Sequence, residues 1–154
     1  PYQRGGAVIR TNADEGVYLR GPLKRRLMEL MFDGEPQAQA AAKAAAKANR
    51  EAFDAYRKLL QIPGDAAALA GLAPRYRNAA LGDIVVTRAG GKARIDVGAF
   101  SSEIVTQPQP DGSLAFVTID PVAAGFQMVR ADKDGKRALV VRDGQHEYVF
   151  DAVE

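Results

Sequence analysis

The residues that could carry out catalysis are few. The chain has three serines, Ser101, Ser102 and Ser113, and a single histidine, His146. None of the serines sits in the Gly-x-Ser-x-Gly turn that exposes a nucleophile, and one histidine without clustered carboxylates cannot build a typical zinc site. The absence of cysteine excludes disulfides, thiolate ligands and cysteine nucleophiles. We therefore expect no catalytic residue, metal or cofactor within these 154 residues.

His146 could instead contribute to a ligand-binding site. Strand alternation places it on one face with Tyr148 and Phe150, and eight strands can enclose one small ligand. One interpretation is a polar group lining a small cavity; the other is structural support, with His146 hydrogen-bonding at a barrel end. The candidate ligand-binding residues are Phe116, Phe126, Met128, His146 and Tyr148.

Other binding motifs are weak. Asp132 and Asp134 begin the spacing of a calcium loop, but a hairpin turn explains them. The stretches "RGGA" and "AGGK" are too short to cradle a phosphate, and neither leads into a helix. A net charge of +2 with mixed signs gives no indication of nucleic-acid binding. No apolar run reaches the ~18 residues of a membrane span, so we expect none.

The first half of the chain has helical spacing. Leu19, Leu23, Leu27, Leu30 and Met31 recur every three or four residues and predict one apolar helix face. The charged residues between them are expected on the other side: Arg20, Lys24, Arg25 and Glu29.

Proline and glycine mark the ends of this helix. Pro22 is tolerated near a helix start, so the regular helix is expected to begin close to Gly21. Asp33-Gly34 should end it, and Pro36 should open the next helix.

The second helix, 36–60, is rich in alanine, with large apolar residues only at its end. Alanine favours helix but has little area to bury. We interpret the segment as a spacer of roughly 35 Å at 1.5 Å per residue. A helix that binds a partner or a membrane surface needs a large apolar face, which its first four turns lack.

Composition changes near residue 72, after which β-branched and aromatic residues alternate with turn dipeptides. Four dipeptides mark hairpins: Gly90-Gly91, Asp111-Gly112, Asp134-Gly135 and Asp143-Gly144. The predicted strands are Arg75–Asn78, Asp83–Arg88, Lys92–Val97, Ser101–Gln107, Ser113–Ile119, Phe126–Arg130, Arg137–Arg142 and His146–Asp151. Eight short strands in sequence order favour an up-and-down barrel, since closure removes exposed edges, with an interior mostly filled by side chains.

The chain opens on a predicted strand without a partner. In "RGGAVIRTNADEG", the apolar run before the polar turn is followed by no other strand for about 60 residues. Residues 5–34 resemble the last strand and C-terminal helix of the serine β-lactamase and penicillin-binding-protein fold, in which Gly6 to Asn12 fits the closing strand. The stretches "LAPRYRNAALGDIVVTRAGGKARIDVG" and "DGKRALVVRDGQHEYVF" resemble the lipocalin-like domain appended to class-C-like serine hydrolases.

This resemblance implies a parent reaction in which serine is acylated by an ester, amide or lactam and then hydrolysed. The family's Ser-x-x-Lys motif is absent, because no serine here has lysine three residues later. Tyr76-Arg77-Asn78 matches the family's Tyr-x-Asn motif in form only, because it falls in the first predicted barrel strand.

The expected fold is α+β: an N-terminal strand and two helices, then a small antiparallel eight-stranded lipocalin-like barrel. The expected domains are a catalytic-domain fragment, a helical linker and the barrel, at 1–34, 35–72 and 73–154. The expected function is that of a non-catalytic accessory domain of a serine hydrolase; the alternative is a stand-alone module that binds a small apolar ligand.

The expected partner is the missing catalytic domain. A homodimer through Ala7–Thr11 and the Leu23/Leu27 helix is a second possibility. The resemblance favours an extracytoplasmic location for the parent.

Overall fold

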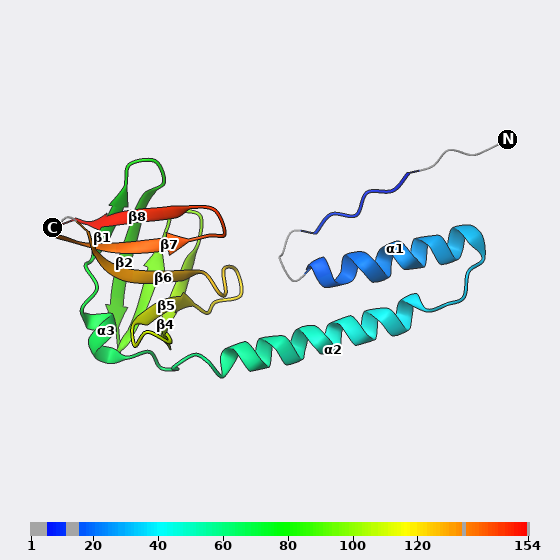
Figure 1. Cartoon of the computed structure of the whole chain (residues 1–154), viewed down its shortest axis with the longest axis horizontal. Coiled ribbons are helices and arrows are strands. Elements are labelled where there is room, and N and C mark those ends of the chain that lie inside the picture. Colours follow the sequence, from blue (N-terminus) through cyan, green and yellow to red (C-terminus); the bar gives the residue numbers. More distant parts are fainter. Residues whose placement is uncertain (1–5, 12–15, 134, 154) are drawn as a thin grey trace. The chain divides into compact units, whose positions relative to one another are not determined.

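The structure is a computed structural model that describes residues 6–11, 16–133 and 135–153 (Figure 1). The chain divides into two compact units, residues 1–57 and 58–154. The first unit is helical and the second is a closed antiparallel β-barrel. The expected α+β class with an eight-stranded, lipocalin-like barrel is confirmed.

The first unit contains two helices, α1 (Val17–Phe32) and α2 (Ala38–Arg57), which pack against each other. Helix α1 ends as predicted at Asp33, which has the left-handed backbone conformation (φ 48°), and the Gly34 N–H donates to the Glu29 carbonyl at 3.0 Å. The chain then turns back into α2, so the two helices form a hairpin (Figure 1).

The predicted start of α1 near Gly21 is wrong, because α1 begins at Val17 and Pro22 lies inside it. Proline normally clashes with the Cβ of the residue before it and disfavours helix there. Gly21 has no Cβ, which relieves that clash and lets the helix continue through Pro22.

The predicted strand at Ala7–Thr11 is also absent: the described residues 6–11 belong to no helix or strand. A strand needs the hydrogen bonds of a neighbouring strand, and every strand that the structure describes belongs to the barrel. The segment instead runs alongside α1 (Figure 1), where Gly6, Ala7 and Ile9 border a groove with Leu27 and Met28.

The segment 35–72, expected as a linker, is divided between the two units. Helix α2 belongs to the first unit, where it packs on α1, so the segment does not form one continuous spacer. The short helix α3 (Ala66–Ala70) belongs to the second unit. Small side chains of α2 lie in this packing, with Ala38 buried and Ala41 and Ala42 half-buried.

The strands of the barrel are neighbours in their order along the sequence, and β1 pairs with β8 to close it. All eight predicted strands are confirmed, with ends that differ by a few residues. The observed strands are β1 (Arg75–Asn78), β2 (Gly82–Ala89), β3 (Lys92–Asp96), β4 (Ser101–Pro108), β5 (Leu114–Thr118), β6 (Gln127–Lys133), β7 (Lys136–Arg142) and β8 (Glu147–Ala152).

Apolar side chains from all eight strands and from the α3 region form one buried cluster. Its members are Leu69, Leu72, Ala73, Tyr76, Ile84, Val86, Ala93, Ile95, Ile104, Phe116, Met128, Leu139 and Phe150. The alternation of buried and exposed residues that predicted the strands therefore also selects the interior face.

Hydrogen bonds hold α3 and the segment after it against the strands. The Asp65 side chain accepts from the Ala68 N–H at 2.7 Å and caps the start of α3. Arg88 of β2 donates to the carbonyls of Leu69 and Leu72 at the other end. Leu69 is thereby fixed within the core cluster of the barrel.

Candidate functional site

The structure brings four of the five candidate ligand-binding residues together. Phe116 and Met128 are direct partners across β5 and β6 and are buried, with 2% and 0% of their surfaces exposed. Phe126 and Tyr148 are half-buried and pack against the same cluster. These four side chains contribute to the barrel core.

His146 lies outside the core, exposed in the turn between β7 and β8. Its ring stacks on Tyr148 with the centroids 5.9 Å apart. Asp143 accepts the backbone N–H groups of Gln145 and His146 at 2.7 and 2.6 Å, and these bonds lower the pKa of the Asp143 carboxyl. Asp143 therefore organises the turn, and the exposed side chain of His146 does not line the interior.

The serines have structural hydrogen bonds. The buried Ser102 hydroxyl donates to the Glu103 carbonyl and accepts from the Asp120 N–H. The Ser113 hydroxyl donates to Asp111 at 2.6 Å within a turn. Ser102 lies on β4, whereas Ser113 lies in the turn before β5.

Tyr76 and Asn78 of the formal Tyr-x-Asn motif are also structural. Tyr76 is buried, and its hydroxyl accepts the Ala73 N–H at 2.8 Å. The Asn78 side chain donates to the Val149 carbonyl and accepts from Ala80 and Leu81. Asn78 thus links β8 to the turn that leads into β2.

The described residues include neither a cluster of metal ligands nor a helix that could span a membrane. No group of three or more histidine or acidic side chains there could hold a metal ion. Asp132 lies on β6, and its suggested calcium-loop partner Asp134 falls outside the described residues. None of the helices in the described ranges is long and apolar enough to cross a membrane.

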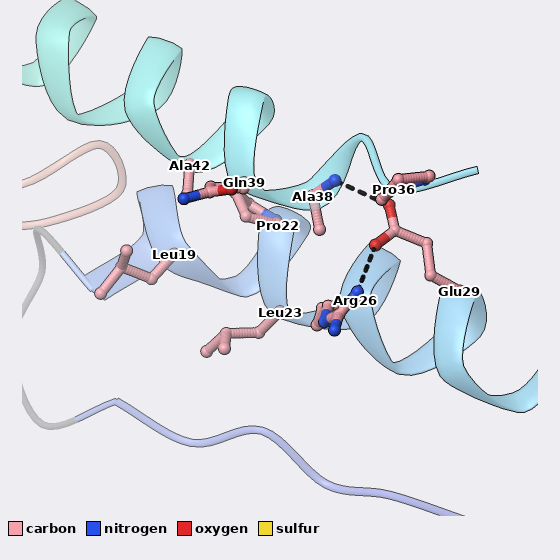
Figure 2. Close-up of a pocket in the computed structure, with 9 residues that line it drawn as sticks. All are labelled: Leu19, Pro22, Leu23, Arg26, Glu29, Pro36, Ala38, Gln39 and Ala42. Carbon is pink, nitrogen blue, oxygen red and sulfur yellow. Dashed lines mark hydrogen bonds and ion pairs between the residues drawn. The ribbon is translucent and has the colours of Figure 1, made fainter. Parts of the chain in front are cut away.

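The helical hairpin also has a polar junction between its two helices. Glu29, expected on the polar side of α1, is buried, with 7% of its surface exposed. Its Oε1 accepts the backbone N–H groups of Gln37 and Ala38, both at 2.7 Å. A carboxylate from α1 thus caps the positive end of α2 (Figure 2).

A signal for this junction was present in the sequence. The residue before α2 is Gln37, which is not one of the usual capping types, and the first turn of α2 has no acidic residue. The free N–H groups at that end needed an acceptor from elsewhere in the chain.

We expect the hairpin to lose helicity as the pH falls. Burial acts to raise the pKa of Glu29, but the N–H donors of Ala38 and Gln37, together with Arg26, outweigh it and hold that pKa below its ordinary value. A carboxyl with a lowered folded-state pKa stabilises fully above its unfolded pKa, and this contribution disappears as pH falls through the folded value. Far-UV circular dichroism between neutral and acidic pH should therefore show the loss below the ordinary glutamate pKa.

The test variant is Glu29→Gln, which keeps an acceptor oxygen but cannot ionise. The control is Glu51→Gln on the exposed face of α2. Glu29→Gln should have a less stable hairpin at neutral pH and a weaker dependence on acid. Glu51→Gln should retain the wild-type profile. An unchanged acid transition in Glu29→Gln would show that another carboxyl controls it.

The remaining surface of α1 mixes large apolar side chains with the exposed basic residues Arg20, Lys24, Arg25 and Arg26. Large side chains are exposed along it and at the facing end of α2: Val17, Tyr18, Leu19, Leu23, Met28, Leu30, Met31, Phe32 and Phe53. The hairpin in this chain therefore leaves apolar surface that a partner could cover.

Two separate surfaces can be distinguished on α1. The first, which we call the sheet flank, consists of Leu27, Met28, Met31 and Phe32; with residues 6–9 it borders a groove of about 680 Å³. The second lies beside α2, where Leu19 and Leu23 border a groove of about 520 Å³ with Pro22, Ala38 and Ala42 (Figure 2). Both surfaces lie within the first unit.

Comparison of the whole chain with family models, with curated proteins and with solved structures finds no match.

Proposed function

We propose that the chain is the non-catalytic C-terminal region of a β-lactamase-like serine hydrolase. In this proposal the parent enzyme acylates a serine with an ester, amide or lactam and then hydrolyses the acyl-enzyme. The catalytic residues belong to an upstream domain, which is the partner of the helical hairpin. An extracytoplasmic location is part of the same proposal.

The observation that carries the proposal is that residues 6–11 lie beside the sheet flank of α1. The segment is not paired with a strand, yet it contains Val8, whose side chain is 81% exposed. Beside it lies a helix with exposed apolar residues. The edge of a β-sheet consists of a segment that pairs with a neighbouring strand and is often covered on one face by a helix. Among the described residues, no strand pairs with residues 6–11.

The free-energy cost of exposed apolar side chains and unpaired backbone groups favours a partner for residues 6–11 and the sheet flank. Fully burying one large apolar side chain is worth roughly 1.5–3 kcal/mol, and an unpaired extended segment offers N–H and C=O groups for another strand. We propose that strands of the catalytic domain pair with residues 6–11 while the sheet flank of α1 covers the same sheet. The resemblance of Gly6 to Asn12 to a closing strand supports this arrangement.

The genomic sequence upstream of Pro1 tests the proposal directly. We expect an open reading frame that continues in frame for several hundred residues and encodes Ser-x-x-Lys. A native start codon at or just before Pro1 would contradict the proposal and favour the ligand-binding module.

The purified chain should not hydrolyse nitrocefin or p-nitrophenyl esters, because the hydroxyls of Ser102 and Ser113 are engaged in structural hydrogen bonds. The measurement is absorbance against a heat-denatured control. Hydrolysis that disappears in Ser101→Ala, Ser102→Ala or Ser113→Ala would overturn the assignment of a non-catalytic region.

One observation favours the alternative, a module that binds a small apolar ligand. Phe100 and Phe126 meet edge to face, with their centroids 5.8 Å apart, and both are only half-buried against the core. Val97 and Tyr148 pack against the same cluster and are also half-buried. The test is binding of an apolar fluorescent probe to the chain. Binding that is lost in Phe126→Ser, but kept in Phe53→Ser on α2, would support this function.

A further inference from the structure

A ridge of side chains on α1 continues the sheet flank toward the start of the helix. Four residues, spaced by four, three and four positions, lie in one line along α1: Arg20, Lys24, Leu27 and Met31. All four border the groove that the sheet flank shares with residues 6–9. The ridge is therefore basic in its first half and apolar in its second half.

The two basic residues of the ridge have no acidic partner. Arg20 and Lys24 are exposed, and neither forms an ion pair or a side-chain hydrogen bond within the described part of the chain. Arg25 and Arg26 differ, because both lie within ion-pair distance of Glu29. A partner that covered the ridge without supplying a carboxylate would remove water from two unpaired cations, which costs free energy.

We propose that the strand that pairs with residues 6–11 carries two acidic residues, two positions apart, on the side that faces α1, with apolar residues beyond them. The carboxylates bind Arg20 and Lys24, and the apolar side chains pack on Leu27 and Met31. The inference rests on the strand pairing that the proposed function includes. It adds the chemistry of the partner strand, which is acidic at one end of the groove and apolar at the other.

The spacing of the two cations matches that of a strand. Residues 6–11 run alongside α1 (Figure 1), so a strand paired with them follows the same helix. Arg20 and Lys24 are one helical turn apart, about 6 Å at 1.5 Å per residue. Side chains on one face of a strand repeat every second residue, about 6.8 Å. Two carboxylates on one strand face therefore lie opposite both cations together.

The strand has to come from outside the residues that the structure describes. Every strand among them already pairs within the closed barrel. A second copy of residues 6–11 lacks the required charge, because its one charged residue, Arg10, is basic. Like charges brought together at an interface are destabilising, so the ridge selects a strand of different sequence.

The test is binding of two extended, fluorescently labelled peptides to the full chain, measured by fluorescence anisotropy. Valine and threonine alternate in both peptides. Two valines at one end are replaced by glutamate in the acidic peptide and by lysine in the basic peptide. Each peptide is made in both sequence directions, because a strand can pair in either. We expect the acidic peptide to bind at least about tenfold more tightly than the basic peptide.

Charge reversal on the ridge should reverse this preference. Arg20→Glu/Lys24→Glu should bind the basic peptide more tightly, and Arg20→Gln/Lys24→Gln should bind the two peptides equally. The control is Lys43→Glu/Lys47→Glu, which reverses two exposed lysines with the same spacing on α2 and should keep the wild-type preference. Circular dichroism should show wild-type helicity in all three double variants.

Equal binding of both peptides to the wild-type chain would overturn the inference and leave the proposed strand pairing in place. Binding of neither peptide would overturn both the inference and the pairing. Binding of dodecanoate in their place, lost in Arg20→Gln/Lys24→Gln, would assign the groove to an acyl ligand. The gene tests the hydrolase separately: an acidic-peptide preference without an upstream Ser-x-x-Lys would support the acidic strand and contradict the hydrolase.

Discussion

Replacing Met128 by alanine is expected to destabilise the barrel by about 2–5 kcal/mol, the range for deleting such a side chain from a packed core. Met128 is fully buried, pairs with Phe116 and belongs to the core cluster. The deletion removes buried methylene groups and the thioether, and it leaves a cavity in a closed barrel that can relax only in part. The free energy of unfolding is to be measured in urea through the amide resonances of barrel residues. These resonances report the stability of the barrel separately from that of the hairpin.

Val122→Ala is the matched control, because Val122 lies in the loop between β5 and β6 with 72% of its surface exposed. Surface changes of this kind usually alter stability by less than about 0.5 kcal/mol. A cost below about 1 kcal/mol for Met128→Ala would mean that Met128 borders a void and not a packed interior. That result would favour the ligand-binding alternative over the accessory function.

Tyr76→Phe is expected to cost about 1–3 kcal/mol, the penalty for leaving a buried donor without its acceptor. The Tyr76 hydroxyl accepts the Ala73 N–H at 2.8 Å, and both residues are buried. Without the hydroxyl, the segment after α3 loses the hydrogen bond between Ala73 and Tyr76 of β1. Hydrogen exchange of the Ala73 amide should accelerate more than exchange at β4 or β5.

The control for this substitution is Tyr148→Phe, because the Tyr148 hydroxyl has only a 3.4 Å contact with the exposed Asp143. It should change stability little. If Tyr76→Phe were as neutral as Tyr148→Phe, the Ala73 N–H would have another acceptor, and α3 would be held mainly by Leu69 and Arg88.

The sequence predicted the barrel well because its information is local. Strands such as Lys92–Asp96 alternate strictly between buried and exposed residues, and Gly90-Gly91 marks the turn before it. Such signals define each hairpin without knowledge of the others. The predicted last strand began one residue too early, so His146, which alternation grouped with Tyr148 and Phe150, lies in a turn organised by Asp143.

The hairpin was less predictable because its organisation depends on non-local contacts. The helical spacing around Leu23 was correct, but it could not indicate which sides of α1 would lie uncovered. The burial of Glu29 depends on Gln37 and Ala38, eight and nine residues later, at the start of another helix. Pro22 taken alone predicts a helix boundary, yet α1 continues through it after Gly21.

The pairing of β1 with β8 has a consequence for the order of folding. Tyr76 pairs with Ala152, so ring closure joins residues that are far apart in the chain, whereas the other seven strand pairs are local hairpins. Loop closure of this length is slow compared with hairpin formation. During synthesis, β1 and β7 remain open edges until β8 has emerged from the ribosome, and the nascent barrel can pair with foreign strands during that interval. A chain that stalls just after Arg142 would expose both edges together and should depend on chaperones far more than the completed ring.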